Sequence, residues 1–167
     1  MTRRTFLIAG LALGLGIMAK ALGIMPGLAK EKGRMYQVTK SDEEWRKLLT
    51  AEQYRVLRQE GTEPPFTNRY HANKDPGAYH CAGCDLPVFS SDAKYDSETG
   101  WPSFWQPIAE KAIGTKTDWY LFHPRTEVHC ARCGGHLGHV FDDGPPPTGL
   151  RYCMNSAALN FVPASAR

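Results

Sequence analysis

The residues of this sequence best suited to chemistry are its five cysteines, and they fall into two kinds. Four of them form two C-x-x-C pairs inside similar clusters, residues 80–84 (HCAGC) and residues 129–133 (HCARC). Four thiolates in two such pairs can close a tetrahedral metal site with no position left open. The fifth, Cys153, stands alone in the segment RYCMNS. The pattern therefore separates structural sulfur from a free thiol that could act as a nucleophile.

The paired cysteines predict one structural zinc ion per chain. The expected ligands are Cys81, Cys84, Cys130 and Cys133. Thiolates also suit an iron–sulfur centre, but nothing in the sequence indicates electron transfer. Disulfides or redox dithiols are the other alternative. The 45 residues between the pairs exceed a simple zinc-ribbon spacing, so the metal would tie together two distant parts of one domain. His80 and His129 precede the two turns and are not needed as ligands. Gly83, Gly134 and Gly135 would ease the turns.

Cys153 has neighbours that could support a reactive thiol. Arg151 could lower the pKa of the thiol as a nearby cation. Asn155 would share a face with Cys153 if the segment is an extended strand. His136 and His139, in the segment HLGH, could carry protons. Each feature also has an ordinary interpretation, since a lone cysteine often only packs and histidines are often structural. Only the combination favours a catalytic site.

The overall composition predicts a single globular domain and argues against nucleic-acid binding. The chain has 167 residues, 42% of them hydrophobic, which is enough for a real core. Its formal charge of +3 arises at the N-terminus, where Arg3, Arg4 and Lys20 stand without any acidic residue. Without these three, 17 basic residues balance 17 acidic ones. A neutral body lacks the basic footprint that nucleic-acid binding requires.

The N-terminus has the parts of an export signal over residues 1–21. Paired arginines precede an apolar run that reaches Ala19, and residues 19–21 (AKA) resemble a cleavage site. The arginine pair resembles the bacterial twin-arginine signal, which predicts a periplasmic protein. The alternative is an uncleaved membrane anchor facing the periplasm, although Lys20 would be costly inside a membrane. Residues 22–36 read as a linker.

The remaining residues, 37–167, predict a mainly β domain with a small helical N-terminal element. Ser41 and Thr50 each begin a segment with capping-box spacing, and Trp45, Leu48 and Leu49 follow at helical intervals. Gly61 would end the second helix. Beyond residue 70, short aromatic or β-branched runs alternate with turn clusters, which is typical of small antiparallel sheets. These runs are residues 79–80, 87–89, 119–122, 127–129 and 159–162.

Several stretches closely resemble the B-type peptide-methionine (R)-S-oxide reductases. They are residues 100–104 (GWPSF), 136–141 (HLGHVF), 143–145 (DGP) and 151–157 (RYCMNSA), which occur in the right order together with the paired C-x-x-C motifs. The resemblance covers residues 38–163. It implies antiparallel sheets of the β-tent-like type and a structural zinc away from the active site. It also implies reduction of methionine-R-sulfoxide in oxidised proteins or peptides, with thioredoxin or another thiol as the reductant.

Residue by residue, the resemblance implies a catalytic group and a substrate-binding group. Cys153 would attack the sulfoxide sulfur, while His139, Asn155 and His136 would bind and protonate its oxygen. The substrate-binding residues would be Trp101, Phe141, Asp143 and Arg151, with Trp101 receiving the substrate methyl. The chemistry agrees, because a sulfoxide oxygen leaves only when it is protonated as a thiolate attacks sulfur. Trp101 could instead be core packing, and Asp143 could be a turn residue.

The sequence departs from the family at Thr99, where many members carry a second, resolving cysteine. With four cysteines assigned to the metal, no other thiol remains to attack an oxidised Cys153. We therefore expect an external thiol to reduce it. Two rival interpretations are a zinc-ribbon-like binding module with an inert Cys153 and an exported dithiol oxidoreductase. We expect a monomer that contacts membranes only if the signal is retained as an anchor.

Overall fold

The computed structural model describes residues 36–120 and 123–165. The expected export signal, residues 1–21, and all but the last residue of the expected linker, residues 22–36, lie outside the described residues. Those boundaries stay predictions. All of the described residues belong to one compact unit. Within them, no helix is both long and apolar enough to span a membrane.

The expected N-terminal helices are confirmed, and both begin with complete capping boxes. Helix α1 spans Asp42–Leu48 after Ser41, and α2 spans Ala51–Gln59 after Thr50. Trp45 and Leu49 are buried, whereas Leu48 is exposed, because so short a helix buries only a narrow face. Helix α2 stops just before Gly61, as expected, but the residue in the left-handed conformation is Glu60 at the C-cap.

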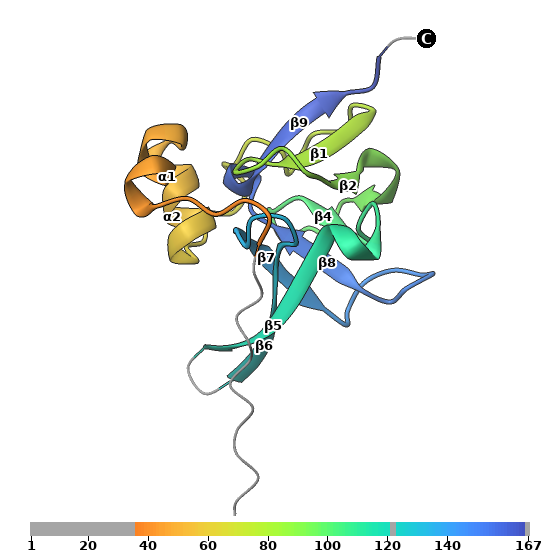
Figure 1. The fold of residues 1–167 in the computed structure, drawn as a ribbon. Helices are drawn as coiled ribbons and strands as arrows, with labels where there is room; N and C mark the ends of the chain where they lie inside the picture. The colour runs from red at the N-terminus through yellow and green to blue at the C-terminus, as the bar shows by residue number, and fades with distance from the viewer. Residues whose placement is uncertain (1–35, 121–122, 166–167) are drawn as a thin grey trace, which may run out of the picture. The chain divides into compact units, whose positions relative to one another are not determined.

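The rest of the domain is antiparallel β-structure, which confirms the expected fold class. A three-stranded sheet has the order β2-β1-β9, and a six-stranded sheet has the order β3-β4-β8-β7-β6-β5. The strands are β1 (Gly77–Cys81), β2 (Pro87–Ser90), β3 (Lys94–Tyr95), β4 (Ser103–Phe104), β5 (Ile113–Tyr120), β6 (His123–Cys130), β7 (His136–Phe141), β8 (Arg151–Met154) and β9 (Leu159–Pro163). Figure 1 shows both helices together on one side of the sheets, and the β5–β6 hairpin reaching away from them.

Aromatic side chains join the two sheets into one core. The Phe89 ring on β2 stacks on the Phe104 ring on β4, with centroids 4.5 Å apart. Tyr79 on β1 meets Phe104 edge-on at 5.1 Å. All three residues are completely buried, and each burial contributes about 1.5–3 kcal/mol. This core fixes β4, and with it the neighbouring strand β8 that carries Cys153.

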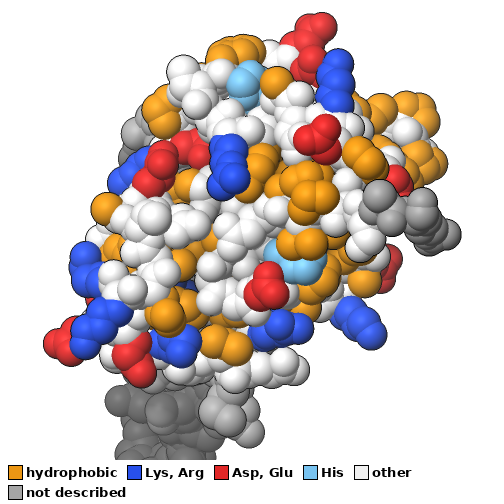
Figure 2. Space-filling model, turned by 90° about the horizontal axis from the view of Figure 1, so that it is seen from above, with side chains coloured by type: hydrophobic (Ala, Val, Ile, Leu, Met, Phe, Trp, Pro, Cys, Tyr) orange, Lys and Arg blue, Asp and Glu red, His pale blue; other side chains and the backbone are white. Residues whose placement is uncertain are grey.

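The surface carries charges of both signs close together. In Figure 2, basic and acidic side chains are interspersed with apolar ones over the face shown. The charges on this face therefore do not form one large positive or negative patch.

Candidate active site and metal centre

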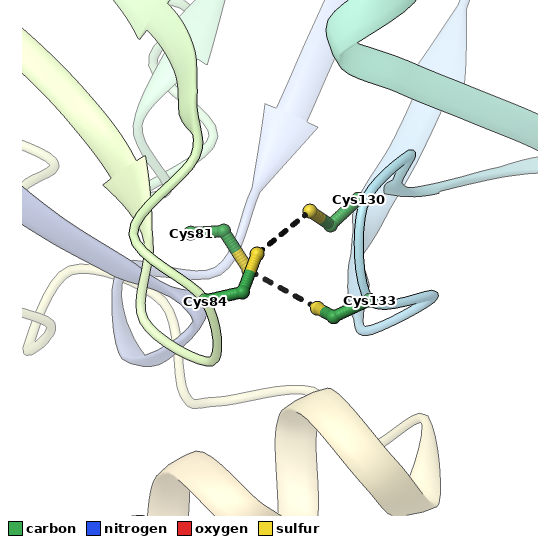
Figure 3. Close-up of side chains that lie close together, drawn as sticks. All are labelled: Cys81, Cys84, Cys130 and Cys133. Atoms are coloured by element: carbon green, nitrogen blue, oxygen red, sulfur yellow. Dashed lines mark hydrogen bonds between the residues drawn. The ribbon is translucent and has the colours of Figure 1, made fainter. Parts of the chain in front are cut away.

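The four paired cysteines meet in one cluster, as the sequence predicts. In Figure 3, Cys81 and Cys84 approach from one side and Cys130 and Cys133 from the other, with their sulfur atoms turned toward one another. The Sγ atoms of Cys81 and Cys133 are 3.7 Å apart, and those of Cys84 and Cys130 are 3.4 Å apart. All four lie within 4.8 Å of one another. The near contacts thus run between the two C-x-x-C pairs.

The two cysteine turns share one backbone design. In the first, the amide of Asp85 donates to the Cys81 carbonyl at 2.8 Å, and in the second, Gly134 donates to Cys130 at 2.9 Å. Asp85 and Gly134 both have positive φ, 59° and 69°. The expectation that Gly83 eases the first turn was therefore wrong, because Asp85 occupies its left-handed position. Aspartate tolerates that conformation better than most side chains.

Surrounding elements hold the two turns together. Arg132 of the second turn donates to the Cys84 carbonyl of the first at 3.1 Å, and Arg58 of α2 donates to the Cys133 carbonyl at 3.2 Å. Trp45 of α1 lies so close to Gly83 that a Cβ there would meet its ring at 3.6 Å. The N-terminal helices therefore pack directly over the cysteine cluster.

This cluster fits a tetrahedral metal. Zinc–sulfur bonds of about 2.3 Å place tetrahedral sulfur atoms about 3.8 Å apart, close to the two sulfur–sulfur distances found here. A disulfide needs about 2.05 Å, and all five cysteines are free. Among the described residues, the cluster contains cysteines only, so neither His80 nor His129 joins it.

Cys153 lies apart from this cluster, in the middle of the six-stranded sheet. On β8 it stands directly opposite Ser103 of β4 on one side and His139 of β7 on the other. The row continues to Tyr95 of β3, opposite Ser103, and to Glu127 of β6, opposite His139. Directly paired residues of antiparallel strands point to the same face. The sheet register therefore brings the thiol, the imidazole and the flanking polar groups onto one face.

The Cys153 thiol is only partly accessible. Burial raises the pKa of this thiol, whereas the charge of Arg151 and the hydroxyls of Thr99 and Ser103 lower it less strongly. Thr99 Oγ1 lies 4.0 Å from the sulfur. Burial therefore disfavours the thiolate, and the Arg151 charge and the nearby hydroxyls favour it.

Arg151 is held on the same face by two partners. Its guanidinium donates two hydrogen bonds to Asp143, at 2.8 and 2.7 Å. Its Cζ also lies 4.4 Å from the centre of the Phe141 ring. This bidentate pairing lowers the pKa of Asp143. Asp143 is thus more than a turn residue, since it fixes the cation that acts on Cys153.

His139 has a carboxylate partner that the sequence analysis missed. Its Nε2 lies 2.8 Å from Oδ2 of Asp118 on β5, and Arg125 of β6 donates to the same oxygen at 2.5 Å. Burial lowers the pKa of His139, and Asp118 only partly offsets the effect. The hydrogen bond with His139 in turn lowers the pKa of Asp118. The pair therefore orients the imidazole and keeps Asp118 charged.

His136 has a similar and more deeply buried partner. Its Nδ1 lies 2.9 Å from Oε1 of Glu127, and both residues are almost fully buried. Burial alone would raise the pKa of Glu127, but the bonds with His136 and Lys116 outweigh it and lower that pKa. Nε2 of His136 is buried with no hydrogen-bond partner among the described residues. The two imidazoles are neighbours, with ring centroids 5.3 Å apart.

Strand register could have revealed both carboxylates. A hairpin between Tyr120 and His123 pairs Asp118 with Arg125, and the turn between β6 and β7 pairs Glu127 with His139. The runs at residues 119–122 and 127–129 predicted only parts of β5 and β6, and they did not specify the register of the two strands. That omission hid the partners of the histidines.

Glu63, which no sequence motif pointed to, holds Trp101 in place. The indole Nε1 donates to the Glu63 carbonyl at 3.1 Å. The buried carboxylate of Glu63 accepts from the amides of Ser156 and Ala157 at 2.5 and 2.8 Å. Burial raises the pKa of this carboxyl against those bonds. Glu63 therefore connects the indole to the backbone that follows Cys153.

Asn155 lies one residue beyond the strand that carries Cys153. Strand β8 ends at Met154, and Asn155, whose backbone is still extended, is the N-cap of the short 3-10 helix that follows. Its Oδ1 accepts from the Glu63 amide, and its Nδ2 donates to the Leu137 carbonyl, both at 3.1 Å. The structure thus brings Cys153, His139, Arg151 and Phe141 to one face and places Asn155 in the buried support beside it.

Comparisons with known proteins agree with these features. The family profile described as the SelR domain matches residues 49–163. The peptide methionine sulfoxide reductase MsrB of Leptospira interrogans is 57% identical over 126 residues, which cover 75% of this chain and 96% of that protein. The proteins of that name from Methanosarcina barkeri and Pseudomonas putida are 57% and 55% identical over 74% and 77% of this chain, and over 87% and 97% of their own lengths. The resemblance read from the sequence is confirmed, and the chain belongs to the MsrB family of peptide methionine sulfoxide reductases.

Proposed function

We propose that this protein reduces methionine-R-sulfoxide, in oxidised proteins or peptides, to methionine. The observation that carries the proposal is the register that sets Cys153 directly opposite His139 on one face of the sheet. The names of the relatives support the reaction class.

The reaction needs a thiolate and an acid on opposite ends of one S–O bond. The Cys153 sulfur attacks the sulfoxide sulfur, the oxygen passes to Cys153, and the methionine thioether leaves with its electron pair. The sulfoxide is reduced by two electrons, and Cys153 is oxidised by two to a sulfenic acid. Protonation of the oxygen is what makes its transfer possible.

The two histidines supply that protonation. Asp118 engages Nε2 of His139, which leaves its Nδ1 for the sulfoxide oxygen or a bound water. His136, held by Glu127, has an Nε2 with no hydrogen-bond partner among the described residues, and its ring lies beside that of His139. In this step a protonated imidazole gives its proton to the sulfoxide oxygen, and Asp118 holds the His139 ring in place while it does so. Asn155 acts here through its bonds to Glu63 and Leu137, which fix the backbone after Cys153.

The substrate methyl is received by Trp101, whose indole is held by Glu63. Aromatic surface favours both the methyl and the positive character that develops on a protonated sulfoxide sulfur. Phe141 and Arg151 border the face, and Asp143 holds the guanidinium. These fixed positions distinguish the two epimers, because only one places oxygen toward the histidines while methyl meets the indole.

The four-cysteine cluster holds one structural zinc in this proposal. The donor set and the spacing of the sulfur atoms support zinc, which would stabilise the fold and take no part in the reaction. Metal analysis of the purified protein should find one zinc ion per chain, and iron in its place would contradict this assignment.

The wild-type protein should reduce the R epimer of a blocked methionine sulfoxide with dithiothreitol and leave the S epimer unchanged. Separated epimers and quantification of the thioether product provide the test. Turnover of the S epimer alone would overturn the proposed geometry. No turnover of either epimer by folded, metal-loaded protein would instead favour the zinc-ribbon-like binding module.

Recycling is expected to use an external thiol such as thioredoxin. Thr99, whose Oγ1 lies 4.0 Å from the Cys153 sulfur, stands where a resolving cysteine could have been, and the other four thiols belong to the four-cysteine cluster. After one turnover without reductant, thiol counting should show the loss of Cys153 alone, trapped as a sulfenic acid by dimedone. An internal disulfide that includes Cys153 would contradict this prediction.

We also propose that the enzyme repairs proteins outside the cytoplasm. Arg3 and Arg4 before the apolar run support export through the twin-arginine route. Fractionation of cells that express wild type and the Arg3→Lys/Arg4→Lys variant would test it. We expect wild type in the periplasm and the variant in the cytoplasm, and wild type retained on membranes would favour the anchor.

A further inference from the structure

Three hydroxyl groups form a connected chain next to the reactive sulfur. Ser97 Oγ lies 2.6 Å from Ser103 Oγ and 2.8 Å from Thr99 Oγ1. Thr99 Oγ1 in turn lies 4.0 Å from the Cys153 sulfur. Ser97 and Thr99 belong to the loop between β3 and β4, and Ser103 is the direct cross-strand partner of Cys153. None of these three hydroxyl groups takes part in the proposed oxygen transfer.

The number of protons available decides which hydroxyl donates and which accepts in each of these hydrogen bonds. Each hydroxyl has one proton to donate. Ser103 donates its proton to the Trp101 carbonyl at 3.2 Å, so it must accept from Ser97. Because Ser97 donates its one hydroxyl proton to Ser103, it must accept a hydrogen bond from Thr99. A protonated Cys153 completes the series as a donor to Thr99. In the thiol form every hydroxyl is therefore used once.

Ionisation of Cys153 changes what the Thr99 proton can do. The sulfur no longer donates, and it becomes a charged acceptor beside a hydroxyl whose other hydrogen-bond partner, among the described residues, is Ser97. Hydrogen bonds to ionised groups are roughly twice as strong as neutral ones. The Thr99 hydroxyl therefore donates its hydrogen bond to the charged sulfur and no longer to Ser97. A rotation about the threonine Cβ–Oγ1 bond is enough to redirect it.

We propose that the Thr99 hydroxyl is a switchable hydrogen-bond donor to Cys153, which accepts from the thiol and donates to the thiolate, and that Ser97 and Ser103 hold it in place. The position where other family members carry a resolving cysteine thus stabilises the nucleophile in this chain. The inference rests on the proposed function only in taking Cys153 as the nucleophile.

Alkylation of Cys153 tests the donor without requiring turnover. The rate of modification by iodoacetamide is measured against pH, with the Cys153 peptide quantified by mass spectrometry. Thr99→Val keeps the shape of the side chain and removes the hydroxyl. We expect it to move the midpoint of the profile upward by about 0.5 to 1 pH unit, which lowers the rate at neutral pH about three- to tenfold. Thr99→Ser keeps the hydroxyl and should retain the wild-type midpoint.

The ionisable groups around Cys153 stay the same in these variants. They are Arg151 on β8, with its partner Asp143, together with His139 on β7 and Tyr95 on β3. If Thr99 served only to pack, the valine variant would behave as wild type and the serine variant would be the impaired one, which would overturn the proposal. Should the valine variant not fold, Thr99→Ala gives the same test. Failure of the epimer assay with an intact alkylation shift would count against the proposed function alone.

Discussion

Replacing Cys153 with serine is expected to abolish reduction of the R epimer, with a loss of at least about a thousandfold. A serine hydroxyl is far less nucleophilic than a thiolate, and no other described thiol lies on this face of the sheet. The measurement is formation of the thioether product under dithiothreitol. Because the thiol is partly accessible and the substitution is close in size, the fold should be retained.

A matched control comes from the next residue of the same strand. Tyr152 points to the opposite face of β8, where its ring packs 5.8 Å from that of Phe89. Tyr152→Phe should therefore keep activity close to wild type. Equal activity of wild type and the Cys153→Ser variant would show that another group performs the reaction. Equal loss in both variants would point to damage to the strand in place of loss of the nucleophile.

Replacing Cys130 with serine is expected to release the metal and to lower the melting temperature by about 10 °C or more. Cys130 is completely buried, and its sulfur is 3.4 Å from that of Cys84. Structural zinc contributes its binding energy directly to folding. In a domain of this size, 1 kcal/mol corresponds to about 4 °C, and loss of a metal ligand costs several kcal/mol. Metal content and thermal unfolding measure the two effects.

The Cys153→Ser variant is the control for this experiment, since it removes a thiol that lies outside the cluster. It should keep full metal content and a melting temperature near that of wild type. A Cys130→Ser protein with full metal and unchanged stability would contradict the assignment of the cluster as a structural metal site. Activity retained by metal-free protein at low temperature would agree with a zinc that has no chemical role.

The local features of the sequence were enough for the helices and the metal site. Ser41 and Thr50 predict the starts of the two helices, because a capping box depends only on residues that are three apart in the sequence. The C-x-x-C pairs predict the cysteine cluster, because two intervening residues are enough for both thiols of a pair to face one ion. Resemblance to a family singled out Cys153 and its neighbours as the proposed reactive site, where spacing alone left ordinary alternatives open.

The tertiary structure decided the partners of those residues. Glu127 reaches His136, and Asp118 reaches His139, through strand registers that no local pattern specifies. Glu63 reaches Asn155 across 92 residues of sequence and fixes Trp101 at the same time. Asn155 follows the last residue of β8, and its side chain bonds Glu63 and Leu137 in the buried support of the site.

The sequence by itself thus determined which residues could react and which could bind a metal, since residue type and short spacing set those properties. Only the tertiary structure decided which charges and hydrogen-bond donors face the reactive thiol. Those groups come from different strands and from the loop between β3 and β4, and the packing of the whole domain fixes their positions. The hydroxyl of Thr99, which the sequence showed only as a missing cysteine, acquires a role of its own through that packing.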